Sequence, residues 1–394
     1  MSIYKTIYLD SHATTPVDPR VVDEMLPYFT DQFGNAASRT HRYGWDAEEV
    51  VRRSRGAVAK LIGAADAERE VVFTSGATES NNLAIKGVAR ANRERGDHII
   101  TQKTEHTAVL DTCRRLEGEG FRVTYLDVDA DGCVDPDSVA KAIDDRTILI
   151  SVMFVNNEVG TVHPVKEIGA IARNRGVLFH CDAVQGLGVL DFDVESLHVD
   201  LASLSAHKMY GPKGIGALYI RKTRPRIRLV PEMDGGGHEG GYRSGTLNVP
   251  LIAGFGKAAE LVLKERKHYG PRILAMRQRL HERLVDGLGE VVLNGTADPN
   301  RHPGNLNICM PGVEAEALMM AVKDVAVSSG SACTSTKVKP SYVLLAMGRS
   351  EEQAYSSLRF GVSRFNSDDQ IEQAASRFVE EARRLRGLAE GSAV

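Results

Sequence analysis

Several features that would assign this chain to a particular class are absent from its sequence. No apolar run approaches the roughly 20 residues needed to cross a bilayer. The N-terminus, Met1-Ser2-Ile3-Tyr4-Lys5, opens into strand-like sequence without an apolar signal segment. The net charge is only −3 at pH 7, so no basic surface for nucleic acid or an anionic membrane is expected. We therefore expect a cytoplasmic protein that binds neither nucleic acid nor membrane.

Cysteine is scarce and scattered. The five cysteines are an odd number, and no CxxC pair occurs among Cys113, Cys133, Cys181, Cys309 and Cys333. Neither a disulfide framework nor a structural zinc site is expected, because both use cysteines at short, regular spacing. Cys113, Cys181 and Cys309 lie in helix or strand patterns and are interpreted as core residues. Cys333 differs, because small polar residues surround it, as in an exposed reactive thiol.

The first two-thirds of the chain alternates between apolar strand patterns and helical patterns. The strand patterns cover residues 71–73, 98–100, 123–126, 147–154 and 177–181, and the helical patterns cover 81–95, 107–118 and 165–175. This alternation predicts an α/β fold with a mainly parallel sheet that helices cover on both faces. Functional residues are then expected on the loops that follow the strands.

From about Leu251 the pattern changes. Two long helical segments, 251–269 and 272–288, precede short strands at 291–293, 305–310, 325–327 and 356–362 and a last helix at 368–386. We interpret this part as a smaller α+β domain that the N-terminal segment completes. The predicted large domain is residues 15–260, and the small domain is residues 1–14 with 261–394.

Two residues could bind a carbonyl cofactor. Lys208 precedes a Gly/Pro turn and the apolar strand 217–220, and a lysine in such a setting can form a Schiff base with pyridoxal phosphate. An ordinary surface lysine before a turn is the alternative. Asp182 ends an apolar strand, where an unpaired carboxylate is costly. The protonated ring nitrogen of a cofactor would be its partner, and a helix cap is the alternative.

Several other segments could bind a ligand, but each also has an ordinary structural interpretation. Residues 74–82 place small and hydroxyl side chains at a helix start, which suits a phosphate or an ordinary N-cap. His106 follows a strand, where a lone histidine is more often a capped or core residue than a catalytic one. The turn 155–160 ends another strand; its amides could donate to a cofactor oxygen, or it could equally be a tight turn. Arg359, within a strand, could hold a carboxylate or form a structural ion pair. The GxGxxG pattern in 235–240 lacks the strand–turn–helix context of a dinucleotide site, so a flexible loop is predicted there.

Seven motifs occur in an order that resembles a known family. They are Ser-Gly-Ala-Thr-Glu-Ser (75–80), Thr-Glu-His (104–106), Asn-Asn-Glu-Val-Gly (156–160), Asp-Ala-Val-Gln (182–185), Ser-Ala-His-Lys (205–208), Arg-Ser-Gly-Thr (243–246) and Ser-Ser-Gly-Ser-Ala-Cys (328–333). Together they resemble the cysteine desulfurase family (NifS/IscS-like, group I), in the class V aminotransferase group of fold type I pyridoxal phosphate enzymes. The resemblance runs from about Tyr8 to Arg386. It implies a large domain with a mainly parallel seven-stranded sheet, and a smaller α+β domain that carries the catalytic cysteine loop.

The resemblance also implies a reaction and its residues. Lys208 would hold pyridoxal 5'-phosphate and move a substrate proton, while Cys333 would take the sulfur of L-cysteine as a persulfide and leave L-alanine. His106 would stack on the cofactor ring with an acid/base role. The other implied cofactor contacts are Ala77, Thr78, Asn157, Asp182, Gln185, Ser205, Ala206, His207 and, from the second chain of a homodimer, Thr246. Asn35 and Arg359 would bind the substrate carboxylate.

The implied partner is an iron–sulfur scaffold protein or another sulfur acceptor, such as one that serves tRNA thiolation. No metal is expected in the chain by itself, although Cys333 could be a transient iron–sulfur ligand shared with a scaffold. The sequence departs from the family in two places. It shows no extended tail after 387–394, like the one that docks a scaffold in housekeeping members, and Ala36 replaces a common proline.

Two other interpretations remain open from the sequence. A selenocysteine lyase, or another class V lyase, would use the same cofactor scaffold, and Cys333 would then be dispensable. A non-catalytic partner-binding protein could also share the fold. The joint presence of Lys208, Asp182, His106 and Cys333 argues against the second of these.

Overall fold

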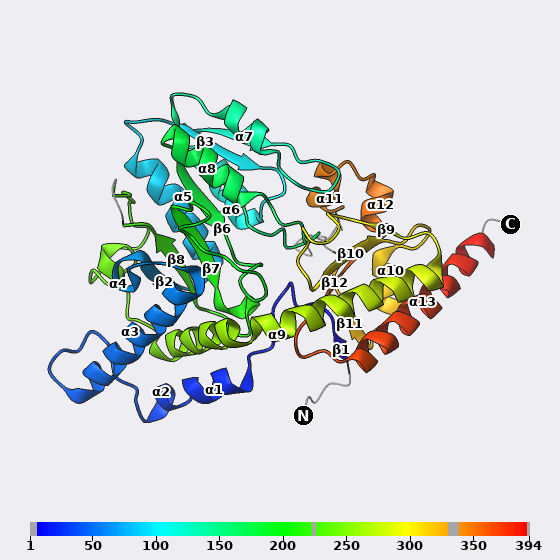
Figure 1. Cartoon of the computed structure of the whole chain (residues 1–394), viewed down its shortest axis with the longest axis horizontal. Coiled ribbons are helices and arrows are strands. Elements are labelled where there is room, and N and C mark those ends of the chain that lie inside the picture. The colour runs from blue at the N-terminus through cyan, green and yellow to red at the C-terminus, as the bar shows by residue number, and fades with distance from the viewer. Residues whose placement is uncertain (1–5, 223–225, 330–338, 392–394) are drawn as a thin grey trace.

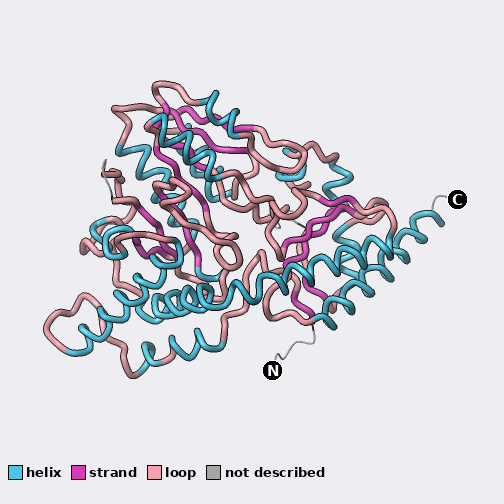
Figure 2. The backbone as a smooth tube through the Cα atoms, viewed as in Figure 1, coloured by secondary structure: helices cyan, strands magenta, loops and turns pink. Residues whose placement is uncertain are grey.

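The computed structural model describes residues 6–222, 226–329 and 339–391. Its elements form two groups, a larger one around a seven-stranded sheet and a smaller one around a three-stranded sheet. Figure 1 shows the long helix α9 (Val249–Leu288) running from one group to the other. The strands form two separate clusters in Figure 2.

The larger sheet has the strand order β2-β8-β7-β6-β5-β3-β4. Only β8 runs antiparallel to its neighbours, and the other adjacent strands are parallel. The predicted mainly parallel seven-stranded sheet is therefore confirmed. The strands are β2 (Val71–Thr74), β3 (His98–Gln102), β4 (Arg122–Leu126), β5 (Thr147–Ser151), β6 (Leu178–Asp182), β7 (Leu201–Ser205) and β8 (Gly216–Ile220).

Apolar cores lie on both faces of this sheet. Along β2, Phe73 belongs to one core and Val72 to the other; along β8, Tyr219 and Leu218 divide in the same way. Successive strand residues point to opposite faces, so continuous apolar runs are required wherever helices cover both faces. The helices of this part are α1 (Pro19–Met25), α2 (Pro27–Thr30), α3 (Arg42–Ile62), α4 (Ala67–Glu70), α5 (Ala77–Ala91), α6 (Thr107–Glu117), α7 (Pro136–Ala142) and α8 (Val165–Arg175).

The smaller group combines the C-terminal part of the chain with its N-terminal strand. Strands β9 (Val292–Leu293), β10 (Asn305–Cys309) and β12 (Ser357–Gly361) form an antiparallel sheet. Strand β1 (Ile7–Tyr8) pairs with β11 (Val325–Ala326). This pairing places the N-terminal segment beside the C-terminal part, and the domain boundaries remain a prediction. The helices here are α10 (Ala315–Ala321), α11 (Tyr342–Ala346), α12 (Glu351–Tyr355) and α13 (Asp368–Gly391).

The sequence predicted two helices where the structure has the single helix α9. Pro271 lies inside it and removes one backbone donor. Packing on both sides of the proline continues nevertheless, since Tyr269 and Ile273 are buried in the same core of the smaller group. The helix also packs along α3 at one end and α13 at the other. Tertiary packing thus outweighs the local cost of Pro271.

Candidate active site

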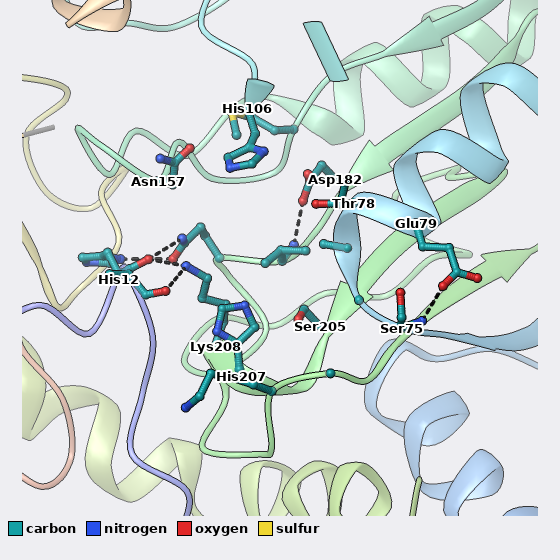
Figure 3. Close-up of a pocket in the computed structure, with 18 of the residues that line it drawn as sticks. His12, Ser75, Thr78, Glu79, His106, Asn157, Asp182, Ser205, His207 and Lys208 are labelled. Atoms are coloured by element: carbon teal, nitrogen blue, oxygen red, sulfur yellow. Dashed lines mark hydrogen bonds between the residues drawn. The ribbon is translucent and has the colours of Figure 1, made fainter. Parts of the chain in front are cut away.

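A cavity of about 520 Å³ lies where several strands of the larger sheet end. Asp182 is the last residue of β6 and Ser205 the last of β7, while His106 follows β3. Ligand sites in open α/β sheets form beyond the carboxyl ends of the strands. Nineteen side chains or backbone segments line the cavity, including Lys208 and Arg359. Segments between His12 and Arg359 therefore converge on one site, as Figure 3 shows in part.

The start of α5 forms one end of the cavity. Its N-cap is Gly76, which makes no side-chain cap hydrogen bond, so N–H groups of the first turn are available to an anion. Strand β8 approaches this turn closely: a Cβ on Gly216 would lie 2.7 Å from Cα of Gly76. Ala77, Thr78, Ser205 and His207, the expected phosphate contacts on this chain, all line the cavity. The structure brings these predicted residues together.

Glu79 stabilises this turn and was missed by the sequence reasoning. Its Oε2 accepts from the backbone N of Ser75 at 2.7 Å, and its Oε1 accepts from Arg243 at 2.9 Å. Burial raises the pKa of the carboxyl, but the bonds from Ser75 and Arg243 outweigh it and leave the pKa below its usual value. The signal in the sequence was an acidic residue in the first helical turn. Glu79 thus ties the segment that carries Arg243 to the start of α5, at the end of the cavity where a phosphate is expected.

Asp182 lies at the cavity wall and is only 6% exposed. Its Oδ2 accepts from the side-chain amide of Asn81 at 2.8 Å, and its Oδ1 accepts from the backbone N of Val184 at 3.1 Å. The helix cap considered from the sequence is wrong, because no helix lies in the described segment between β6 and β7. Asp182 instead bonds to the backbone of the following turn and faces the cavity, and its pairing with a cofactor nitrogen stays a prediction. Asn81, fully buried on α5, was missed, because nothing in a single sequence pairs residues 101 positions apart.

Lys208 ends the short 3-10 helix η1 (Ala206–Lys208), directly after β7. Its ammonium donates to the backbone carbonyls of His12 and of Ala13, the latter at 2.8 Å. Burial, and next the nearby charge of Arg359, lower its pKa to about 8. The amine is therefore poised to lose a proton near neutral pH, which is unusual for a lysine.

Gln185 and His12 form a reciprocal pair beside Lys208. The amide nitrogen of Gln185 donates to the carbonyl of His12 at 3.0 Å, while its Oε1 lies 3.1 Å from Nδ1 of His12. Both residues line the cavity, and Figure 3 shows His12 next to the end of Lys208. His12 was missed, because its place on the N-terminal segment did not suggest a contact with residue 185.

His106 and Asn157 lie on the side of the cavity opposite His207 in Figure 3. His106 is the N-cap of α6, and its Nδ1 accepts from the backbone N of Ala108 at 3.1 Å. The capped-histidine interpretation is therefore confirmed, and the ring nevertheless lines the cavity. Asn157 lines it as well, and its carbonyl accepts from Arg359 at 3.0 Å.

Arg359 connects the smaller group to the cavity. It lies on β12, and its guanidinium pairs with Asp10 at 2.8 Å while it also lines the cavity. Its side chain is 8% exposed. The structural ion pair expected as one alternative is therefore present, and binding of a substrate carboxylate remains a prediction.

Four predicted site residues do not line this cavity or cannot be placed. Ala206 is buried, Asn35 is exposed and accepts from the backbone N of Ala37, and Thr246 is exposed on the loop after Arg243. Cys333 lies outside the described residues. The roles of these residues stay predictions.

Within the described ranges, no group of three or more His, Cys, Asp or Glu side chains is arranged to hold a metal ion. No helix in this part of the chain is both long enough and apolar enough to cross a membrane.

Comparison with known proteins now identifies the family. Residues 7–374 match the family described as Aminotransferase class-V. The chain belongs to the class-V aminotransferase family. It is 59% identical over 382 residues to a protein named cysteine desulfurase IscS from Anaeromyxobacter dehalogenans, covering 97% of this chain and 94% of that one. The resemblance to cysteine desulfurases stated from the sequence is confirmed.

Two solved structures have the same fold as this chain. A NifS-like protein superposes with a TM-score of 0.88 at 34% identity, covering 95% of this chain and 98% of that chain. A structure titled SspA in complex with cysteine superposes with a TM-score of 0.80 at 37% identity, covering 92% of this chain and 100% of that one. The predicted fold type I architecture of this class-V chain is therefore confirmed.

Proposed function

We propose that this chain is a pyridoxal 5'-phosphate-dependent cysteine desulfurase, which converts L-cysteine into L-alanine and a persulfide on Cys333. One observation carries the proposal: Lys208 and Asp182 line the same cavity. The start of α5, which has no side-chain cap, lines this cavity as well. The identity of 59% to a protein named cysteine desulfurase supports the same activity.

The donor set of the cavity fits pyridoxal 5'-phosphate. A phosphate would lie at the N-terminus of α5, where Gly76 makes no side-chain cap, with Thr78, Ser205 and His207 around it. Burial lowers the pKa of His207 to about 4, so this ring is a neutral donor or acceptor at pH 7. Lys208 would hold the carbonyl carbon, and Asp182 would pair with the ring nitrogen.

When bound, the cofactor withdraws electrons from the substrate Cα and makes its proton acidic. Asp182 would keep the ring nitrogen protonated, and Asn81 and Val184 hold that carboxylate in place. His106 would cover one face of the ring and exclude water. Lys208, with its low pKa, would take the Cα proton and return it to the product.

The substrate carboxylate would be bound by Arg359, which already reaches the cavity while paired to Asp10. Asn35 is the second residue proposed for this role. The Cys333 thiolate would attack the substrate sulfur and form a persulfide as the bond from that sulfur to Cβ breaks. The electron pair of that bond would stay on Cβ, which takes a proton to give L-alanine. An acceptor protein, such as an iron–sulfur scaffold, would then collect it.

A homodimer would complete the site. Thr246 is exposed and follows a loop that is bonded to two elements of the same chain. Glu239 of this loop accepts from the backbone of β2, and Arg243 donates to Glu79 of α5. We propose that Thr246 reaches the phosphate bound by the second chain. A cytoplasmic location is proposed from the sequence alone.

The experiment that tests this proposal measures L-alanine and sulfide from L-cysteine with the full chain, the cofactor and a thiol reductant. We expect equal amounts of both products.

Two variants separate the proposed roles of the lysine and the cysteine. Lys208→Ala should abolish the absorption band of the covalently bound cofactor. Cys333→Ser should keep that band but release almost no sulfide. Cys133→Ser is the matched control, because Cys133 is a half-buried free thiol whose pKa burial raises to about 11. Undiminished sulfide from Cys333→Ser would overturn the proposal in favour of a lyase, and a parallel assay with L-selenocysteine would identify it.

A further inference from the structure

A second, much smaller cavity lies behind Lys208. Its volume is about 20 Å³, and its lining includes Ser11, His12, Gln185 and Lys208. His12, Gln185 and Lys208 also line the large cavity, so they form the wall between the two. About 10–15 Å³ measured in this way suffices for one water molecule. The small cavity therefore has room for one water and for little else.

Two residues of this lining each have a buried polar atom that lacks a partner. Among the described residues, Oγ of Ser11 and Nε2 of His12 are buried and make no hydrogen bond. Ser11 is 9% exposed and His12 is 3% exposed. Buried polar atoms are nearly always paired with protein or with ordered water, because an unpaired one costs free energy. A water bound in the small cavity would be a hydrogen-bond partner for both of these atoms.

The hydrogen bonds around His12 decide which nitrogen of its ring needs a donor. Gln185 uses its amide N–H to donate to the carbonyl of His12, so its Oε1 can only accept. His12 must then donate from Nδ1 to that oxygen. Burial lowers the pKa of His12 well below its usual value, so the ring is neutral and Nε2 is left as a bare acceptor.

We propose that the small cavity holds one ordered water, which donates to Nε2 of His12, is bonded to Oγ of Ser11, and thereby fixes the His12 tautomer that orients Gln185. Lys208 lines the same cavity and, without cofactor, has a third ammonium proton beyond those it donates to His12 and Ala13. The water can accept this proton only while the cofactor is absent; with the cofactor bonded to Lys208, the water keeps its bonds to His12 and Ser11.

The consequence for the large cavity follows from the reciprocal pair. Gln185 presents a fixed amide to the cofactor ring only if His12 donates to its Oε1. His12 is therefore a positioning residue, as is Ser11 through the water. This consequence rests on the proposed function, whereas occupation of the small cavity does not.

A high-resolution crystal structure of the full chain with pyridoxal 5'-phosphate tests the water directly. We expect one ordered water at hydrogen-bond distance, about 2.6–3.2 Å, from both Nε2 of His12 and Oγ of Ser11. An empty small cavity overturns the proposal, whether or not the protein desulfurates cysteine.

Nuclear magnetic resonance of the same holoenzyme, with 15N-labelled histidine, tests the tautomer. The signal that disappears in His12→Asn belongs to His12, and it should show a proton on Nδ1 and none on Nε2. A proton on Nε2 overturns the proposal. This result also does not depend on activity.

Ser11→Val tests whether the water matters. Valine adds a methyl group and removes the hydroxyl, so it should expel the water, mix the two His12 tautomers and weaken binding of pyridoxal 5'-phosphate about tenfold, as for the loss of one hydrogen bond. Ser356→Val is the matched control, since Ser356 is 6% exposed and precedes β12. If the water is expelled while tautomer and affinity stay unchanged, the positioning role is overturned.

Discussion

The side-chain amide of Asn81 donates a 2.8 Å hydrogen bond to Oδ2 of Asp182. Asn81 lies on α5, whose first turn forms the phosphate end of the cavity, and Asp182, which also lines the cavity, ends β6. One helix therefore contributes to both proposed charge contacts of the cofactor. A shift of α5 would disturb the phosphate and the ring nitrogen together.

Replacing Asn81 by leucine should weaken cofactor binding. The substitution removes a donor to a buried carboxylate, and such charged hydrogen bonds contribute about 1.5–3 kcal/mol, which corresponds to roughly ten- to a hundredfold in affinity. Titration of the apoprotein with pyridoxal 5'-phosphate measures this change. Asn82→Leu on the same helix is the control, because within the described part of the chain the side chain of Asn82 bonds to the carbonyl of Thr78 and not to Asp182. Equal affinities of the two variants would contradict the role of Asn81.

The low pKa of Lys208 predicts how proton transfer depends on pH. Burial lowers this pKa to about 8, so the neutral amine becomes the main form above that pH rather than above about 10.4. The exchange of the α-proton of L-alanine with solvent deuterium, catalysed by the holoenzyme, should rise up to about pH 8 and then level off. Exchange that keeps rising to pH 10, or that does not change between pH 7 and pH 9, would argue against Lys208 as the base.

Glu105 should make the folded protein less stable as the pH rises. It is fully buried, and burial raises its pKa to about 8. A raised folded-state pKa stabilises the fold below the unfolded value, and this contribution is lost as the pH rises through about 8. Glu105→Gln keeps an acceptor for the backbone N of Met153 and should therefore gain thermal stability relative to the native chain at pH 8 but not at pH 4.5. A gain of the same size at both pH values would contradict this assignment.

The buried ion pair between Arg55 and Glu239 should be necessary for stability. The two groups are 2.7 Å apart, and their side chains are 9% and 1% exposed. Arg55→Met leaves the carboxylate of Glu239 buried without its cation, which costs about 3–5 kcal/mol. The thermal midpoint should therefore fall by several degrees.

The control for this ion pair is Arg52→Met on the same helix. Arg52 pairs with Glu49, but both side chains are more than half exposed, at 61% and 58%, so this pair contributes at most about 1 kcal/mol. The double variant Arg55→Met with Glu239→Leu should recover much of the lost stability. Equal midpoints for Arg55→Met and Arg52→Met would show that the buried pair does not stabilise the fold.

Much of the fold could be predicted because its signals are local. The periodicity of residues 165–175 predicted a helix with the observed bounds of α8, and five apolar runs predicted β2 to β6. The prediction of two separate helices on either side of Pro271 was wrong. Proline is a strong local signal for a helix end, whereas the packing of Tyr269 and Ile273 in one core depends on residues far away in the sequence and could not be predicted.

The sequence by itself determined the alternation of strands and helices, and it singled out Lys208 and Asp182 as candidate cofactor-binding residues. Both were possible because motifs and periodicity lie within short segments. Only the tertiary structure decided how His12 pairs with Gln185 and how Asn81 pairs with Asp182. These contacts join residues 173 and 101 positions apart, and such distances close only when β6, α5 and the N-terminal segment pack together. Tertiary packing therefore decides which groups hold the predicted lysine and carboxylate in place.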